Sequence, residues 1–97
     1  MKIHILQEAE EELAEAIQHY EDISHGLGIR LKNQVKQAIL WIEDNYELPR
    51  VRKKGYRRIN CKSFPYYIAY FTSEEDIFIV AIANGYKRPE YWIKRGI

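Results

Sequence analysis

Cations and aromatic side chains are concentrated at the end of the sequence, where residues 87–95 read KRPEYWIKR. Arg88, Tyr91, Trp92 and Arg95 follow directly on an apolar run. A guanidinium group suits a phosphate or a carboxylate, because its fork of donors pairs with two oxygens at once. We therefore expect Tyr91 or Trp92 to anchor this tail on the core, and Arg88 and Arg95 to be displayed to a partner.

A second basic segment covers residues 50–62, which contain seven cations and no acidic residue. Lysines at a sheet edge prevent pairing with another chain, so such a segment can be a solvated edge strand. Seven cations exceed what edge protection needs, and we favour a surface that binds an anionic partner. The seven are Arg50, Arg52, Lys53, Lys54, Arg57, Arg58 and Lys62.

Metal, thiol and nucleotide-loop chemistry have little support in the sequence. His4, His19 and His25 are spread along the chain, and none has metal-ligand spacing with another His, Cys or carboxylate. Cys61 is the single cysteine, and we interpret it as an inert structural thiol that indicates a reducing compartment. The sequence has no glycine-rich phosphate loop. We expect no metal site and no cofactor.

The N-terminal part indicates a cytoplasmic protein without a membrane span. The first residues turn acidic after a short apolar start, which differs from a secretory signal. No apolar run reaches the ~18–20 residues that a membrane span needs. Glu8, Glu10, Glu11 and Glu12 are expected to form the solvated start of a helix, where the helix dipole favours negative charge.

The spacing of apolar residues predicts an α+β fold in one domain, residues 1–97. A short strand precedes two amphipathic helices, which form an antiparallel hairpin. Strands of a small antiparallel sheet follow, and the last of them, apolar on both sides, is expected to be the most buried. The helices cover one face of the sheet, and we expect the other face to be open to solvent or a partner. The segments are residues 2–6 (strand), 6–23 and 27–45 (helices), 66–71 and 77–83 (strands), and a short tail or helix after residue 84.

Several motifs together resemble the RelE/ParE superfamily of bacterial toxins. They are GLG..L...V..AI..I in the second helix, G.RR at residues 55–58, FPY.I.Y at 64–70, I.I.AI at 77–82 and KRPEYW..R at 87–95. The match covers nearly the whole chain in the right order. The resemblance implies a helical hairpin packed on a small antiparallel sheet, a cytoplasmic toxin of a type II toxin–antitoxin module, and a cognate antitoxin that neutralises it.

The superfamily contains two activities. RelE-like members are metal-independent endoribonucleases that cut mRNA in the ribosome, and ParE-like members bind DNA gyrase and block its cycle. RNA cleavage needs a base, cations that stabilise the charge on the phosphate, and an acid for the leaving oxygen. For the RelE branch, the candidate catalytic residues are Lys53, Lys54, Arg57, Arg58 and Arg88, with Tyr91 as a late proton donor.

We favour the ParE branch, in which the protein acts by binding and is no enzyme. Tyr67 stands where the RelE-type strand carries an arginine, and the KRPEYW..R ending is more similar to ParE. The binding residues are then Arg57, Arg58, Arg88, Tyr91, Trp92 and Arg95, and the partners are DNA gyrase and the antitoxin. The alternatives are a RelE-like ribonuclease, with the ribosome and mRNA as partners, and an inactive member that only binds an antitoxin or its operator complex.

Overall fold

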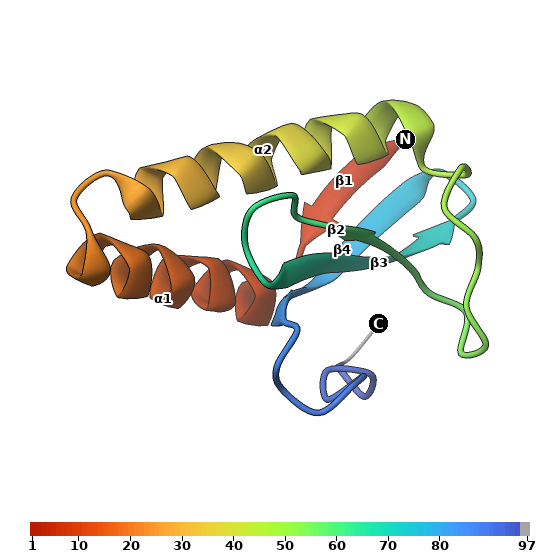
Figure 1. The fold of residues 1–97 in the computed structure, drawn as a ribbon. Coiled ribbons are helices and arrows are strands. Elements are labelled where there is room, and N and C mark those ends of the chain that lie inside the picture. The colour runs from red at the N-terminus through yellow and green to blue at the C-terminus, as the bar shows by residue number, and fades with distance from the viewer. Residues whose placement is uncertain (96–97) are drawn as a thin grey trace.

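The computed structural model describes residues 1–95. Its elements follow one another as β1 (Lys2–Ile5), α1 (Gln7–Ile23), α2 (Leu27–Asn45), β2 (Arg57–Asn60), β3 (Tyr66–Ser73) and β4 (Asp76–Asn84). The two helices form a hairpin beside the sheet (Figure 1). The predicted α+β order is confirmed, and α2 has the bounds that the sequence predicts.

The four strands form one sheet in the order β1-β4-β3-β2. β2, β3 and β4 pair antiparallel, as predicted, and β1 joins β4 in parallel, so that the whole sheet is mixed. A parallel pair needs a long connection between its strands, and here the helical hairpin, β2 and β3 separate β1 from β4. β2 is an edge strand, so its basic residues lie at the side of the sheet where no further strand follows.

One face of the sheet packs against the helices and forms the larger core. Ile68 and Tyr70 of β3 belong to this core, and Tyr67 and Ala69 belong to the cluster on the opposite face, which confirms the predicted alternation. Residues 79–83 of β4 are buried without interruption. Residues on both faces of β4 are therefore buried, which confirms the prediction that this strand, apolar on both faces, is the most buried one.

The turn between the helices depends on Glu21 of α1, whose carboxylate accepts hydrogen bonds from backbone N–H groups at the start of α2. The donors are Gly26 (3.1 Å), Gly28 (2.8 Å) and Ile29 (3.2 Å), and the bond from Gly26 contributes most to lowering the pKa of Glu21. Gly26 has a φ of 89°, a left-handed conformation that favours glycine. A Cβ on Gly28 would lie 2.2 Å from the backbone O of Ile17, so the two helices approach too closely here for any side chain.

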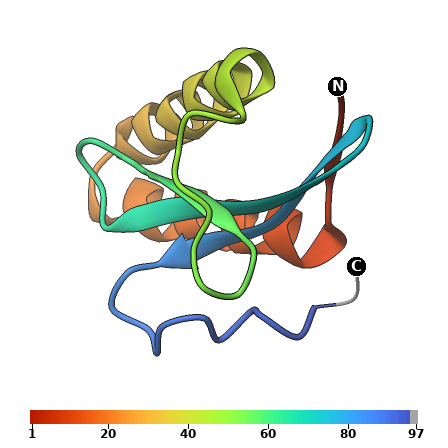
Figure 2. The same ribbon diagram turned by 90° about the vertical axis from the view of Figure 1, so that its right-hand side faces the viewer.

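The C-terminal tail, residues 85–95, covers a large part of the second face of the sheet, so the expectation that this whole face is open was wrong (Figure 2). Trp92 is only 1% exposed and lies in an apolar cluster with Tyr67, Ala69 and Val80. A buried tryptophan removes a large apolar area from water, which holds the tail on the sheet. We call this side of the sheet the tail face. Within the described residues the tail consists of turns and contains no helix.

Candidate functional site

Arg57 and Arg58 are neighbours in β2 and point to opposite faces of the sheet, because successive side chains of a strand alternate. Arg57 lies on the helix side. Its Nε donates to the backbone O of Pro49 at 2.9 Å, and its Nη1 donates to Oγ1 of Thr72 at 3.2 Å. These bonds brace the chain that leads into β2. Of the two arginines, only Arg58 is therefore on the tail face.

Arg58 stacks on the tyrosine that holds the tail. Its guanidinium carbon lies 3.8 Å from the centroid of the Tyr67 ring, and its Nη2 donates to Oδ1 of Asn60 at 2.8 Å. The Tyr67 hydroxyl accepts a hydrogen bond from Nε1 of Trp92 at 2.9 Å. The Trp92 ring meets the Tyr56 ring edge to face, with 4.6 Å between centroids. Trp92 thus anchors the tail, as predicted, and in residues 1–95 the buried Nε of Arg58 has no hydrogen-bond partner.

Glu90 joins the tail to the loop that precedes β2. Its carboxylate accepts hydrogen bonds from Nζ of Lys54 at 2.9 Å and from the hydroxyl of Tyr56 at 2.8 Å. Lys54, followed by Tyr56, lowers the pKa of Glu90, while burial, followed by the bond to Glu90, raises the pKa of Tyr56. Lys54 is therefore engaged, whereas Lys53 is exposed and has no ion pair in the described part of the chain.

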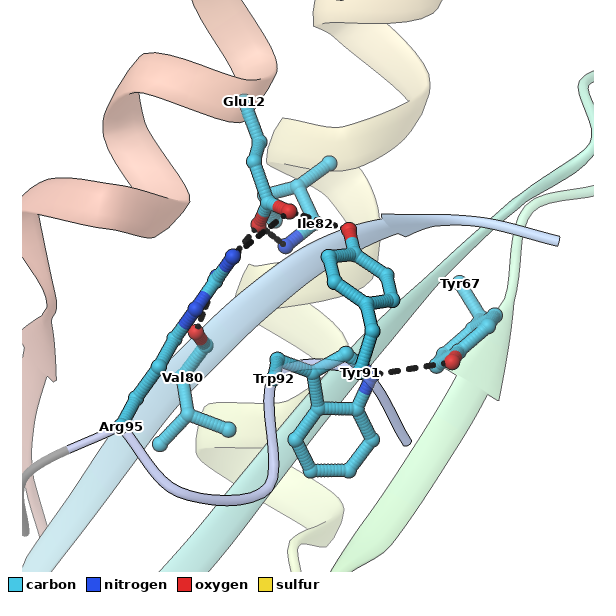
Figure 3. Close-up of polar contacts among 7 residues, drawn as sticks. All are labelled: Glu12, Tyr67, Val80, Ile82, Tyr91, Trp92 and Arg95. Atoms are coloured by element: carbon cyan, nitrogen blue, oxygen red, sulfur yellow. Dashed lines mark hydrogen bonds and ion pairs between the residues drawn. The ribbon is translucent and has the colours of Figure 1, made fainter. Parts of the chain in front are cut away.

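Glu12 of α1 holds the end of the tail (Figure 3). Its carboxylate accepts hydrogen bonds from the Tyr91 hydroxyl, from the backbone N–H of Ile82 at 3.1 Å, and from Nη1 and Nη2 of Arg95 at 2.7 and 3.0 Å. Nη1 of Arg95 also donates to the backbone O of Val80 at 2.9 Å. The expectation that Arg95 is displayed was wrong, because this network takes up its guanidinium and leaves its side chain 18% exposed.

The same network closes an open edge of β4. β1 pairs with β4 no further than Ile79, so the backbone groups of Val80 and Ile82 have no strand beside them on that side. Glu12 accepts the N–H of Ile82, and Arg95 donates to the carbonyl of Val80. Buried backbone groups without partners are costly, and here two side chains replace the missing strand.

Glu12 is the residue of this region that the sequence analysis missed. The expectation of a solvated helix start is wrong for Glu12, because its side chain is only 14% exposed. The available signal is its position three residues after Ala9 and four residues before Ala16. Both alanines are buried, so Glu12 lies on the inner stripe of α1 and cannot be fully solvated.

Arg88 is an arginine of the tail that has no ion pair in residues 1–95. It is exposed and lies close after Tyr86, which is 87% exposed. Its backbone O accepts a hydrogen bond from the N–H of Tyr91 at 3.3 Å, so a tight turn connects it to the anchored part of the tail. Pro89 further restricts the backbone at this point. The result is a displayed guanidinium on a constrained bend, as the sequence predicts.

Several of the candidate residues for RNA cleavage are engaged in separate internal contacts of the fold. Arg57 faces the helices, Lys54 is in an ion pair, and the hydroxyl of Tyr91 donates to Glu12. Burial, together with the bond to that carboxylate, raises the pKa of Tyr91, so its proton is harder to release to a leaving group. Burial also raises the pKa of the Cys61 thiol, the opposite of what an activated nucleophile requires.

Metal-ligating side chains are dispersed over the described residues, 1–95, and no three His, Cys, Asp or Glu side chains are placed to hold an ion together. Over the same residues, neither helix has the length and apolar character to cross a membrane.

Comparisons with known proteins agree with this architecture. A family model described as "ParE toxin of type II toxin-antitoxin system, parDE" matches residues 3–88. Among solved structures, a chain of the "Chromosomal ParDE TA system from P. aeruginosa" is similar with a TM-score of 0.66 and 14% identity, over 87% of this chain and 95% of that chain. The structural likeness concerns the fold, and no curated protein matches the sequence. The resemblance to the ParE branch of the superfamily is confirmed, and the chain belongs to the ParE toxin family of type II toxin–antitoxin systems.

Proposed function

We propose that this ParE toxin acts in the cytoplasm by binding DNA gyrase, without chemistry of its own, and that a cognate antitoxin neutralises it. The observation that carries the proposal is the contrast between Arg88 and three other cations of the candidate site, Lys54, Arg57 and Arg95. Lys54, Arg57 and Arg95 are held in internal contacts, whereas Arg88 projects from a constrained bend with no ion pair in residues 1–95. A displayed arginine can be a main binding contact at a protein interface, whereas RNA cleavage needs several groups that converge on one phosphate.

The setting of Arg88 suits a carboxylate on a protein partner. Its fork of donors can bind both oxygens of a carboxylate, and arginine is frequent among the residues that dominate binding energy at interfaces. Ordering a flexible side chain at an interface costs roughly 0.5–1.5 kcal/mol. The turn to Tyr91 and the buried ring of Trp92 already fix the backbone that carries Arg88, so the tail itself need not be ordered on binding.

The test is a gyrase supercoiling assay with the purified protein, run beside a translating extract in which mRNA is mapped by primer extension. We expect supercoiling to be lost and the mRNA to stay intact. Codon-spaced cuts with normal supercoiling would contradict the proposal and assign RelE-like activity. The absence of both effects, in a protein that binds its antitoxin tightly, would identify an inactive member.

The groove between α2 and β2 is the surface that we expect the antitoxin to use. It encloses about 810 Å³ and is lined by Leu40 and Trp41 of the helix and by Ile59 and Cys61 on the strand side. Leu40 and Trp41 are 48% and 40% exposed. An exposed apolar groove of this kind suits the apolar stripe of an amphipathic segment, and Lys62 on its rim suits an acidic residue beside that stripe.

Co-expression with the neighbouring reading frame tests this surface. Trp41→Ala should weaken capture of the antitoxin by about 2 kcal/mol or more, as expected for a central aromatic anchor. Ile23→Ala is the matched control, because Ile23 is 61% exposed and lies outside the groove. Equal recovery with both variants would place the antitoxin elsewhere. No capture by the unaltered protein would contradict neutralisation by a neighbouring antitoxin.

A further inference from the structure

Three aromatic rings lie next to one another on three neighbouring strands of the tail face. They are His4 on β1, Phe78 on β4 and Phe71 on β3. His4 and Phe78 are register partners, and their rings stack with centroids 5.0 Å apart and 18° between their planes. Phe78 and Phe71 are register partners in the next pair of strands. All three side chains are part-exposed, and together they form a continuous aromatic strip across the sheet.

A hollow of about 830 Å³ lies over this aromatic strip. Its apolar lining is completed by Leu6 and Ile93, and its cations include Lys54 and Lys94. No carboxylate is among the described side chains that line it. Small-molecule sites typically have volumes of about 300–1,000 Å³ and combine apolar walls with a few polar groups. The hollow therefore has the size and the lining of a site for a flat, negatively charged ligand.

We propose that this hollow binds a free nucleotide, with the base stacked on the aromatic strip and the phosphate at Lys94. Every nucleobase has a π face, so stacking on phenylalanine rings gives affinity without selecting one base. Lys94 is exposed and has no ion pair in the described residues, which leaves its ammonium available. Lys54 is a weaker second contact for the phosphate, because its Nζ already lies 2.9 Å from the carboxylate of Glu90.

The charges around the hollow favour a single nucleotide over a nucleic-acid strand. A groove that binds a strand needs a row of cations that follows its phosphates. Here Lys54 and Arg95 are already paired with carboxylates, and Nε2 of His4 lies 2.8 Å from Asp76. Among the described side chains that line the hollow, Lys94 is then the cation without a carboxylate partner, and one such charge suffices for one phosphate group. The site includes neither Arg88 nor the groove between α2 and β2, so it is independent of the proposed function.

The test is an amide chemical-shift titration of the purified protein with adenosine monophosphate. Adenosine, inorganic phosphate and a single-stranded oligodeoxyadenylate serve as comparison ligands. We expect saturable shifts at the aromatic strip with adenosine monophosphate, weaker binding of adenosine, and no binding of phosphate alone. The oligonucleotide should bind no more tightly than the mononucleotide. Binding should also weaken with added salt, because the phosphate contact is electrostatic.

Substitutions distinguish stacking of the base on the aromatic strip from unspecific electrostatic attraction of the phosphate to the cations of the protein. Phe78→Leu keeps an apolar side chain and removes the ring face, so the affinity should fall roughly tenfold. Lys94→Ala should lower the affinity several-fold, and Lys36→Ala, an exposed cation of α2 outside the hollow, should leave it unchanged. Melting curves verify folding, and Phe71→Leu replaces Phe78→Leu if the latter melts early.

Three results would overturn the proposal. The first is the absence of saturable shifts up to millimolar adenosine monophosphate. The second is equal weakening by Lys36→Ala and Lys94→Ala, which would show unspecific attraction to cations. The third is an oligonucleotide that binds the strip much more tightly than the mononucleotide, which would assign the strip to a nucleic-acid strand. Saturable binding that weakens with Phe78→Leu and Lys94→Ala, and not with Lys36→Ala, supports a nucleotide site.

Discussion

Glu12 and Arg95 are 83 positions apart in the sequence and form an ion pair through two hydrogen bonds, which joins α1 to the end of the tail. The same two side chains also complete the hydrogen bonding of β4 where β1 has ended. One contact therefore connects a helix, a sheet edge and the segment that covers the second face. We therefore expect this pair, together with the buried ring of Trp92, to hold the tail in its path over the sheet.

Replacing Glu12 with alanine is expected to lower the free energy of unfolding by about 2–4 kcal/mol, because it leaves a part-buried guanidinium and a backbone N–H without their acceptor. Chemical denaturation measures the loss. Glu11→Ala is the matched control at an exposed neighbouring position, with an expected change within about 0.5 kcal/mol. Equal denaturation midpoints for the two variants would show that the network does not hold the tail.

Gly28→Ala is expected to be more damaging than Gly26→Ala. The Cβ of an alanine at position 28 would meet the backbone O of Ile17 at 2.2 Å, which forces the helices apart and costs about 3 kcal/mol. Position 26 has no atom within 4 Å of such a Cβ, and only its φ of 89° opposes a side chain, at about 1 kcal/mol. Urea unfolding measures the free energy of unfolding of both variants. Equal decreases in that free energy would contradict close packing of the helices at Gly28.

The hairpin turn should contribute a pH-dependent part of the stability. Backbone N–H donors, that of Gly26 above all, hold the pKa of Glu21 below its ordinary value of 4.5. The folded protein therefore binds this proton less tightly than the unfolded chain does. The stabilisation is present above about pH 4.5 and is lost as the pH falls through the lower folded-state pKa.

Melting temperatures of the unaltered protein and of Glu21→Gln, measured from neutral pH down to about pH 3, test this linkage. The other groups titrate in both proteins, so the difference between the two melting temperatures isolates Glu21. We expect that difference to shrink as the solution is acidified below about pH 4.5. A difference that stays constant over the whole range would mean that the carboxylate charge does not stabilise the turn.

The parts of the fold that local pattern determines were predictable from the sequence. α2 has its predicted bounds because its apolar residues recur in steps of three and four, and β4 is buried because it is apolar on both faces. The path of the tail was not predictable in this way. The sequence indicates Trp92 as an anchor. The direction that the tail takes over the sheet is set by turns, one of which holds Glu90 at a φ of 60°.

The candidate site was predictable only in part, because long-range pairing arranges it. Arg57 and Arg58 are equivalent in the sequence, and the register of β2 with β3 sends one to each face. Arg95 and Arg88 are both tail arginines, and only the fold brings Glu12 to one of them. Each of these contacts joins segments that local periodicity cannot relate.

The measurement that most directly tests the central claim is the concentration of purified protein that halves the rate of gyrase supercoiling. We expect the unaltered protein to inhibit supercoiling, and we expect Arg88→Ala to need an at least about tenfold higher concentration, with an unchanged melting temperature. Arg88→Lys should restore little, because the charge returns without the fork of donors. Arg30→Ala, an exposed arginine on α2, should inhibit like the unaltered protein. Full inhibition by Arg88→Ala would contradict the role of Arg88, and no inhibition by the unaltered protein would contradict binding to gyrase.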